Sequence, residues 1–110
     1  MRGYDYQEFA VLYVDDEEMA LRYFARGFNK EFRVLTAVSA AAAWKLIEDP
    51  ANKIAVVITD QRMPAESGVD LLERVRAARP DVVRILTTAY SDLKSAIDAV
   101  NAGGAFRYIS

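Results

Sequence analysis

Short runs of apolar residues alternate along this chain with segments in which apolar residues recur every three or four positions. The runs are rich in β-branched and aromatic residues, which favours strands. They lie at residues 9–14, 32–36, 54–59, 82–87 and 105–109. The first and third runs are almost wholly apolar, as expected of strands buried on both faces of a sheet.

The segments between the runs carry apolar residues at helical spacing. They extend from Met19 to Phe28, from Ala40 to Asp49, from Val69 to just before Pro80, and from Leu93 to just before Gly103. Strands that alternate with crossovers of helix length indicate an α/β fold, a doubly wound parallel sheet of five strands with helices on both faces. The whole chain, residues 1–110, is expected to form one domain.

The amino-acid composition excludes several kinds of structural and catalytic site. The 110 residues include no cysteine and no histidine, so disulfides, thiolate zinc sites and histidine bases are excluded. The net charge of −2 and the absence of a basic run predict no affinity for nucleic acid or anionic lipid. No apolar run approaches the length of a membrane span, and no secretory signal opens the chain, so we expect a cytoplasmic protein.

Polar residues lie where the predicted strands end. Asp15 and Asp16 follow the first strand, Asp60 follows the third, and Thr87 and Thr88 close the fourth. Ligands of open parallel sheets bind at the carboxyl ends of the strands. Three carboxylates gathered there would repel one another unless a cation lay among them, and an all-oxygen ligand set suits Mg²⁺.

Each of these features has an ordinary alternative. Acids after the first strand also favour the N-terminus of a helix, Asp60 could be a turn residue, and the two threonines could be plain strand residues. Acids at the ends of two buried strands, together with a hydroxyl at the end of a third, favour the functional interpretation.

In their order along the chain, five motifs resemble the receiver domain of bacterial two-component response regulators. They are Val14-Asp15-Asp16-Glu17, Val57-Ile58-Thr59-Asp60-Gln61-Arg62-Met63-Pro64, Ser67-Gly68, Leu86-Thr87-Thr88-Ala89 and Gly104-Ala105-Phe106-Arg107-Tyr108. The resemblance runs from about residue 9 to the end of the chain. It implies a flavodoxin-like sheet with strand order 2-1-3-4-5.

The resemblance also implies roles for particular residues. Asp60 would accept a phosphoryl group from the phosphohistidine of a histidine kinase or phosphotransfer protein. Asp15, Asp16, Asp60 and the main-chain carbonyl of Arg62 would hold Mg²⁺. A carboxylate can act as the nucleophile of such a transfer, which depends on charge neutralisation more than on acid–base chemistry.

Two further residues would read the phosphorylated state. Thr88, in preference to Thr87, would hydrogen-bond a phosphoryl oxygen, and Tyr108 matches the aromatic residue that turns inward when the threonine moves. The change would alter a surface around the fourth helix and last strand. By the same resemblance, Arg62 and Tyr90 would flank the path of the attacking water, and they are expected to tune the lifetime of the phosphate.

The chain departs from the family pattern at two places. The family's lysine after the last strand would fall one residue beyond Ser110, and its final helix would follow, so both are missing from this chain. We therefore expect exposed apolar surface and self-association or segment exchange, with an output domain possible in a longer parent protein. Ala65-Glu66 replaces residues that are often glycine and methionine, in a tolerant part of the loop.

Three other interpretations are open to the sequence. A magnesium-dependent phosphohydrolase would carry an acid two residues after its aspartyl nucleophile, where this chain has Arg62. A nucleotide-binding domain would carry a glycine-rich loop after the first strand, where this chain is acidic. A pseudo-receiver, which binds partners without phosphorylation, is disfavoured for a longer parent protein by the intact Asp15, Asp16 and Asp60 set, but the missing lysine leaves it open for this chain.

Overall fold

A computed structural model of the chain describes residues 8–87 and 107–109. Five parallel strands form one sheet in the order β2-β1-β3-β4-β5, which confirms the order expected from the family resemblance. The strands are β1 (Ala10–Val14), β2 (Arg33–Ala37), β3 (Ile54–Asp60), β4 (Val83–Thr87) and β5 (Arg107–Ile109). The order reverses between β1 and β3, and in such sheets the crevice at that point is the usual ligand site.

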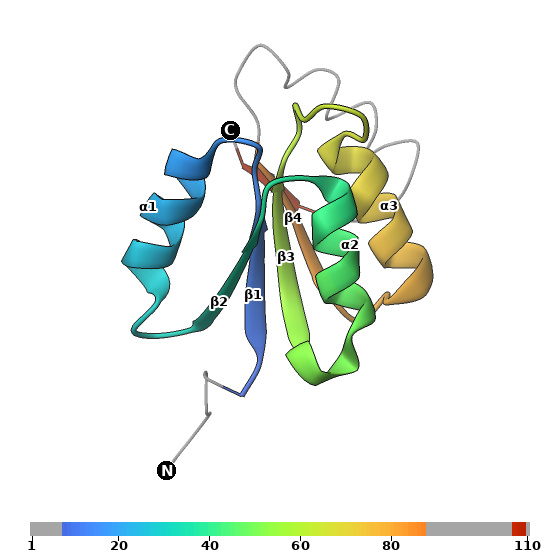
Figure 1. The fold of residues 1–110 in the computed structure, drawn as a ribbon. Helices are drawn as coiled ribbons and strands as arrows, with labels where there is room; N and C mark the ends of the chain where they lie inside the picture. Colours follow the sequence, from blue (N-terminus) through green and yellow to red (C-terminus); the bar gives the residue numbers. More distant parts are fainter. Residues whose placement is uncertain (1–7, 88–106, 110) are drawn as a thin grey trace.

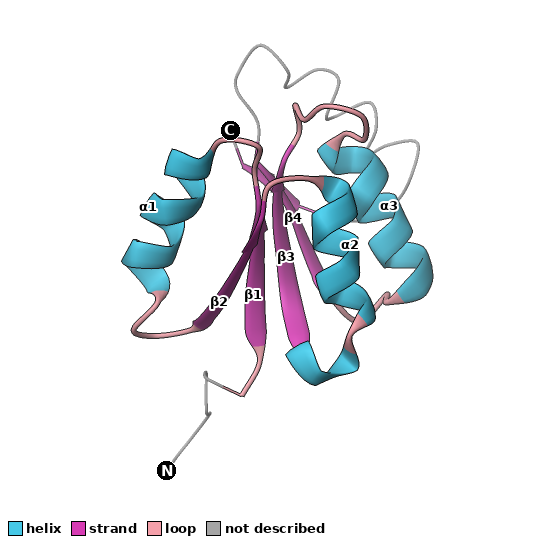
Figure 2. Ribbon diagram, in the orientation of Figure 1, coloured by secondary structure: helices cyan, strands magenta, loops and turns pink. Residues whose placement is uncertain are grey.

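Helices cover both faces of this sheet. The helix α1 (Glu18–Phe28) lies on one face, whereas α2 (Ala40–Glu48) and α3 (Gly68–Ala78) lie together on the other (Figures 1 and 2). This two-sided cover confirms the doubly wound arrangement. The helix expected from Leu93 onward lies outside the described residues.

The main core lies between the sheet and the pair α2 and α3. Residues of β1 that point to this side are completely buried, and α3 contributes a buried apolar stripe. The fully enclosed side chains include Leu12, Val14, Val57, Leu71, Leu72, Val75 and Leu86. Helix α2 begins where predicted, because the Ser39 hydroxyl accepts a hydrogen bond from the Ala42 N–H at 3.0 Å.

The opposite face is more open than the sequence suggested. We expected β1 to be buried on both faces, but only its alternate residues are buried, and Val11 and Tyr13 are half-buried. The Tyr13 ring stacks on Phe24 of α1, with ring centroids 4.3 Å apart. Helix α1 leaves the side chains of Met19 and Tyr23 largely exposed. Among the described residues, one amphipathic helix, α1, covers this face of the sheet.

Boundary differences between prediction and structure are small. Strand β2 begins and ends one residue later than predicted, and β3 extends through Asp60. The helix expected over residues 40–49 ends at Glu48, and a single 3₁₀ turn, Pro50–Asn52, follows it. The Asp49 side chain caps this turn by accepting from the Ala51 N–H at 3.0 Å, so it belongs to the turn and not to the helix.

Candidate acidic site at the carboxyl ends of the strands

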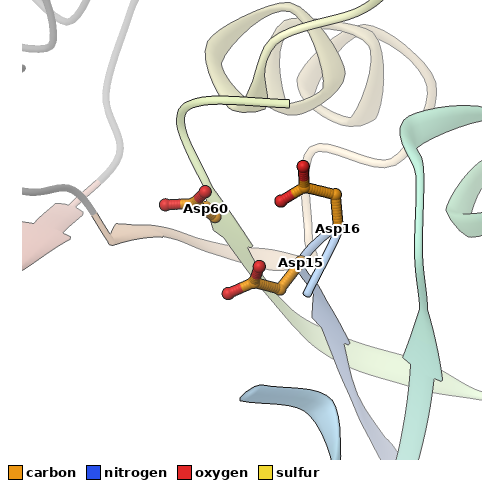
Figure 3. Close-up of side chains that lie close together, drawn as sticks. All are labelled: Asp15, Asp16 and Asp60. Carbon is orange, nitrogen blue, oxygen red and sulfur yellow. The ribbon is translucent and has the colours of Figure 1, made fainter. Parts of the chain in front are cut away.

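Three carboxylates meet where β1 and β3 end. Val14 pairs with Thr59, so the next residue of each strand, Asp15 and Asp60, also lie side by side. Asp15, Asp16 and Asp60 each offer one carboxylate oxygen, and these three oxygens lie within 4.8 Å of one another. Figure 3 shows the three side chains gathered at this edge of the sheet. The structure therefore brings together the acids that the sequence placed at strand ends.

The Asp15 carboxylate is held by two hydrogen bonds. Its Oδ1 accepts from the Glu17 N–H at 3.0 Å, and its Oδ2 accepts from the Tyr13 hydroxyl at 3.3 Å. Burial raises the pKa of Tyr13 to about 12, with Asp15 and Asp60 adding to the shift through their negative charges. Tyr13 therefore stays protonated and keeps its O–H available as a donor to Asp15.

The contribution of Tyr13 to the site was not predicted from the sequence. Residues two apart in a strand point to the same side of the sheet, so a hydroxyl two positions before Asp15 was a signal that could have been followed. It was overlooked because Tyr13 lies inside an apolar run and was counted as a core residue.

Partial burial raises the pKa of the Asp60 carboxyl, and the nearby charges of Asp15 and Asp16 raise it further. The backbone groups of Gln61 and Arg62 act in the opposite direction, by stabilising the charged form through hydrogen bonding. The carboxylates thus repel one another at neutral pH. A cation placed among their oxygens would remove this repulsion.

The donor set fits a hard divalent cation. The three acids supply oxygen only, the ligand atom that Mg²⁺ prefers, and Asp16 is exposed, which leaves room for coordinating water. The structure places Arg62 two residues after Asp60, in the loop that joins β3 to α3. The contribution of its carbonyl stays a prediction.

The β3–α3 loop, residues 61–67, is anchored at both ends. The Gly68 N–H donates to the Gln61 carbonyl at 3.0 Å, and the Gln61 side-chain Oε1 accepts from the Val69 N–H at 2.9 Å. Between these anchors the Met63 side chain is buried in the core. Gln61 therefore helps to cap α3, a role that its position beside Asp60 did not suggest.

The threonine at the end of β4 is engaged with the strand beside it. The Thr87 hydroxyl donates to the Thr59 carbonyl at 3.4 Å, and the Thr87 carbonyl accepts from the Gln61 N–H at 3.1 Å. Thr88 and Tyr90 lie outside the described residues. Tyr108 pairs with Leu86 in the register of β4 and β5, and its switching role stays a prediction.

Comparison with known proteins gives a consistent assignment. The family model for the response regulator receiver domain matches residues 11–110. The hydrogenase transcriptional regulatory protein HoxA of Cupriavidus necator is 40% identical over 99 residues, which are 90% of this chain and 20% of that protein. The photosynthetic apparatus regulatory protein RegA of Rhodovulum sulfidophilum is 34% identical over 94 residues, 86% of this chain and 51% of that protein.

Solved structures agree with these sequence relatives. A response regulator receiver domain protein from Clostridium thermocellum superposes with a TM-score of 0.82 at 33% identity, covering 92% of this chain and 80% of that one. The chain spans only about a fifth to a half of the length of the two curated relatives. With the family model matched over nearly its whole length, this chain belongs to the response regulator receiver domain family of two-component signalling.

Proposed function

We propose that the chain is a phospho-accepting regulatory domain in which Asp60 takes a phosphoryl group from a histidine kinase in a Mg²⁺-dependent reaction. The observation that carries this proposal is the cluster of Asp15, Asp16 and Asp60, whose oxygens lie within 4.8 Å at the ends of β1 and β3. Membership of the receiver family supports it. The domain acts as a switch and not as an enzyme in its own right.

In the proposed reaction an oxygen of the ionised Asp60 carboxylate attacks phosphorus. A P–O bond to Asp60 forms as the P–N bond to the donor imidazole breaks, and the departing nitrogen takes a proton from solvent. Asp15, Asp16, Asp60 and the Arg62 carbonyl would hold Mg²⁺, which when bound supplies positive charge that offsets the charge of the transferring group. Tyr13 and the Glu17 N–H keep Asp15 oriented toward this position.

The proposal also includes the conformational response of the domain to phosphorylation. Thr88 would donate to a phosphoryl oxygen and Tyr108 would turn inward in response, which would change the surface around the fourth helix and β5. The engagement of the Thr87 hydroxyl with the Thr59 carbonyl favours Thr88 over its neighbour for this role. Arg62 and Tyr90 would adjust the persistence of the phosphate.

The partners proposed for the chain are a histidine kinase or phosphotransfer protein and, in a longer parent, an output domain. HoxA, which is named a transcriptional regulatory protein, is about five times as long as the matched segment, which supports an output domain elsewhere in that protein. No helix in the described part of the chain is long and apolar enough to cross a membrane. A cytoplasmic location is proposed because the phospho-donor and the output act there.

Self-association of this chain is a further part of the proposal. The exposed side chains of Met19, Tyr23 and Phe28 on α1 leave apolar surface open to water, which favours association. Sedimentation velocity at tens of micromolar tests it, and a monomer at all concentrations would count against it.

The decisive experiment is incubation with Mg²⁺ and acetyl phosphate, followed by intact-mass measurement. A mass gain of one phosphoryl group is expected in the native chain, none with chelator present, and none in Asp60→Asn. The matched control is Asp70→Asn, which changes an exposed acid in the first turn of α3. A gain that persisted in Asp60→Asn would refute the assignment of the acceptor.

A further inference from the structure

The β3–α3 loop is linked to the outer helices by three side chains, Glu66, Arg74 and Trp44, which we call the Glu66–Arg74–Trp44 clasp. Arg74 Nη1 of α3 donates to Glu66 Oε1 of the loop at 2.6 Å. The Arg74 guanidinium also lies over the Trp44 ring of α2, with Cζ 4.4 Å from the ring centroid. The clasp thus joins the loop to both helices on this face of the sheet, α2 and α3 (Figure 1).

The residue just before Glu66 is in an unfavourable conformation. Ala65 has φ of +70°, and the Glu66 N–H donates back to the Pro64 carbonyl at 2.8 Å. A hydrogen bond that spans two residues around a positive φ defines a γ-turn of the rare, strained kind. Strained backbone persists only where surrounding contacts hold it. Glu66 directly follows Ala65, and its ion pair with Arg74 is such a contact.

The strained turn and the acidic site share one short loop. Gln61 is bonded to Gly68 and Val69, so the two ends of the loop are fixed to each other. Between them lie Arg62, whose backbone stabilises the charged form of Asp60 by hydrogen bonding, and Glu66, which pairs with Arg74 of α3. Because the loop is closed at its ends, a change of conformation at Glu66 is expected to shift the backbone at Arg62.

We propose that Glu66 and Arg74 are positioning residues for the Mg²⁺ site, acting through the β3–α3 loop, with Trp44 as the platform that orients the guanidinium. This inference rests on the proposed function, because it concerns the affinity of the same acidic site. Neither side chain belongs to the acids that would hold the ion. They favour the loop conformation in which the backbone after Asp60 faces the acids.

The expected effect on Mg²⁺ affinity is modest, because the Glu66–Arg74 ion pair is partly exposed to solvent. The Arg74 side chain is 42% exposed and the Glu66 side chain 26% exposed, and ion pairs of this kind contribute little when isolated. Stacking on Trp44 lowers the freedom of the guanidinium and adds a cation–π contact. We expect loss of the pair to weaken Mg²⁺ binding about two- to fivefold.

The test is a calorimetric titration of the metal-free chain with Mg²⁺. The variants are Glu66→Gln, Arg74→Met, the two combined, and Arg74→Lys. Each single removal is expected to raise the Mg²⁺ dissociation constant, the double variant to be no worse than either single one, and Arg74→Lys to restore part of the affinity. Non-additivity of this kind shows that the two residues act through each other.

Arg76→Met is the matched control, since Arg76 is an exposed arginine on the same helix. Trp44 is the only tryptophan of the chain, so its fluorescence reports the environment of the guanidinium in every variant. Circular dichroism verifies that each variant is folded at the titration temperature. If Arg74→Met fails to fold, Glu66→Gln and Arg74→Lys keep the test decisive, because both are expected to bind Mg²⁺ more weakly than Arg76→Met.

The outcomes separate the two proposals. If the native chain binds no Mg²⁺, the proposed function itself fails. If the native chain binds Mg²⁺ and Glu66→Gln and Arg74→Met bind it as tightly as Arg76→Met, the positioning role is refuted. Additive effects in the double variant would refute it as well, because each residue would then act independently.

Discussion

Gly68, the first residue of α3, lies against the backbone of Asp60. A Cβ atom at position 68 would be 2.2 Å from the Asp60 carbonyl oxygen and 2.9 Å from Cδ1 of Leu86. Real side chains do not approach a backbone oxygen so closely, so only glycine allows α3 to begin here. The Gly68 N–H also donates to the Gln61 carbonyl at 3.0 Å. The close contact at Gly68 therefore helps to fix the backbone of Asp60, the candidate phospho-acceptor.

Gly68→Ala is expected to displace α3 or the end of β3. The obstacle is backbone, which cannot rotate away as a long side chain could, so we expect a loss of about 1–3 kcal/mol in the free energy of unfolding. Mg²⁺ binding should weaken as well, because Asp60 moves with its backbone. Urea denaturation and calorimetric titration measure the two effects.

Gly27→Ala provides the control for this substitution. Gly27 lies in α1, and nothing lies within 4 Å of the position its Cβ would take. Alanine is the better helix former, so this variant should gain up to about 1 kcal/mol of stability. Equal stabilities for Gly68→Ala and Gly27→Ala would contradict the close approach at Asp60.

Asp60→Asn should stabilise the metal-free chain at neutral pH. The pKa of Asp60 is raised in the folded state, so folding favours the protonated form, and stability falls as the pH rises from the unfolded pKa through the folded pKa. Asparagine carries no charge and escapes this loss. We expect a gain of up to about 1 kcal/mol, because Asp60 is only partly buried and solvent screens the repulsion.

The pH dependence distinguishes repulsion from packing in this variant. The advantage of Asp60→Asn should be present at pH 7 in chelator and should disappear below about pH 3, where the carboxyl is protonated in both states. Saturating Mg²⁺ should reverse the order by stabilising the native chain more than the variant. Thermal unfolding at several pH values measures this, and an advantage that stayed constant with pH would count against charge repulsion.

Tyr13→Phe removes the hydroxyl that holds Asp15 Oδ2 and leaves the ring on Phe24. Under the proposed function, Asp15 then loses one of two orienting bonds, and Mg²⁺ binding should weaken about two- to tenfold, at or below the low end of outer-shell effects. The change in the free energy of unfolding should stay within about 1 kcal/mol. Tyr23→Phe, on the exposed side of α1, is the control, and equal Mg²⁺ affinity for the two variants would disprove the orienting role.

Ala65→Gly should relieve the strain of the loop. Ala65 has φ of +70°, where glycine meets no steric penalty, so we expect a gain of about 0.5–1 kcal/mol in the free energy of unfolding. Ala65→Val should lose stability, since a β-branched side chain is disfavoured at positive φ. Chemical denaturation of the pair measures the difference. If the valine variant were as stable as the glycine variant, the positive φ at residue 65 would carry no steric penalty and the prediction would be wrong.

The sequence was informative where one local pattern decided the outcome. Alternation of apolar runs with helical stripes predicted the parallel sheet, and the position of Asp15 and Asp60 just after such runs predicted their meeting, because parallel strands end at a common edge. Ser39 marked the start of α2 correctly, since a cap depends on residues four positions or fewer apart.

Other features depended on contacts between distant elements. The half-burial of Tyr13 follows from the single helix that covers this face in the described residues, since its ring stacks on Phe24 of that helix. Ala65-Glu66 was treated as a tolerant pair, but the structure places Ala65 at positive φ and joins Glu66 to Arg74 eight residues later. Neither the turn nor the ion pair leaves a periodic signal in the sequence.

The sequence by itself determined the succession of strands and helices along the chain and the acids that meet at the site, because period and strand-end position are local properties. Its motifs indicated the family. Only the tertiary structure decided how Asp60 is held. The bare backbone of Gly68, the cap from Gln61, and the link from Glu66 through Arg74 to Trp44 depend on how α3 and α2 pack against the sheet. Such packing joins residues that no spacing rule connects.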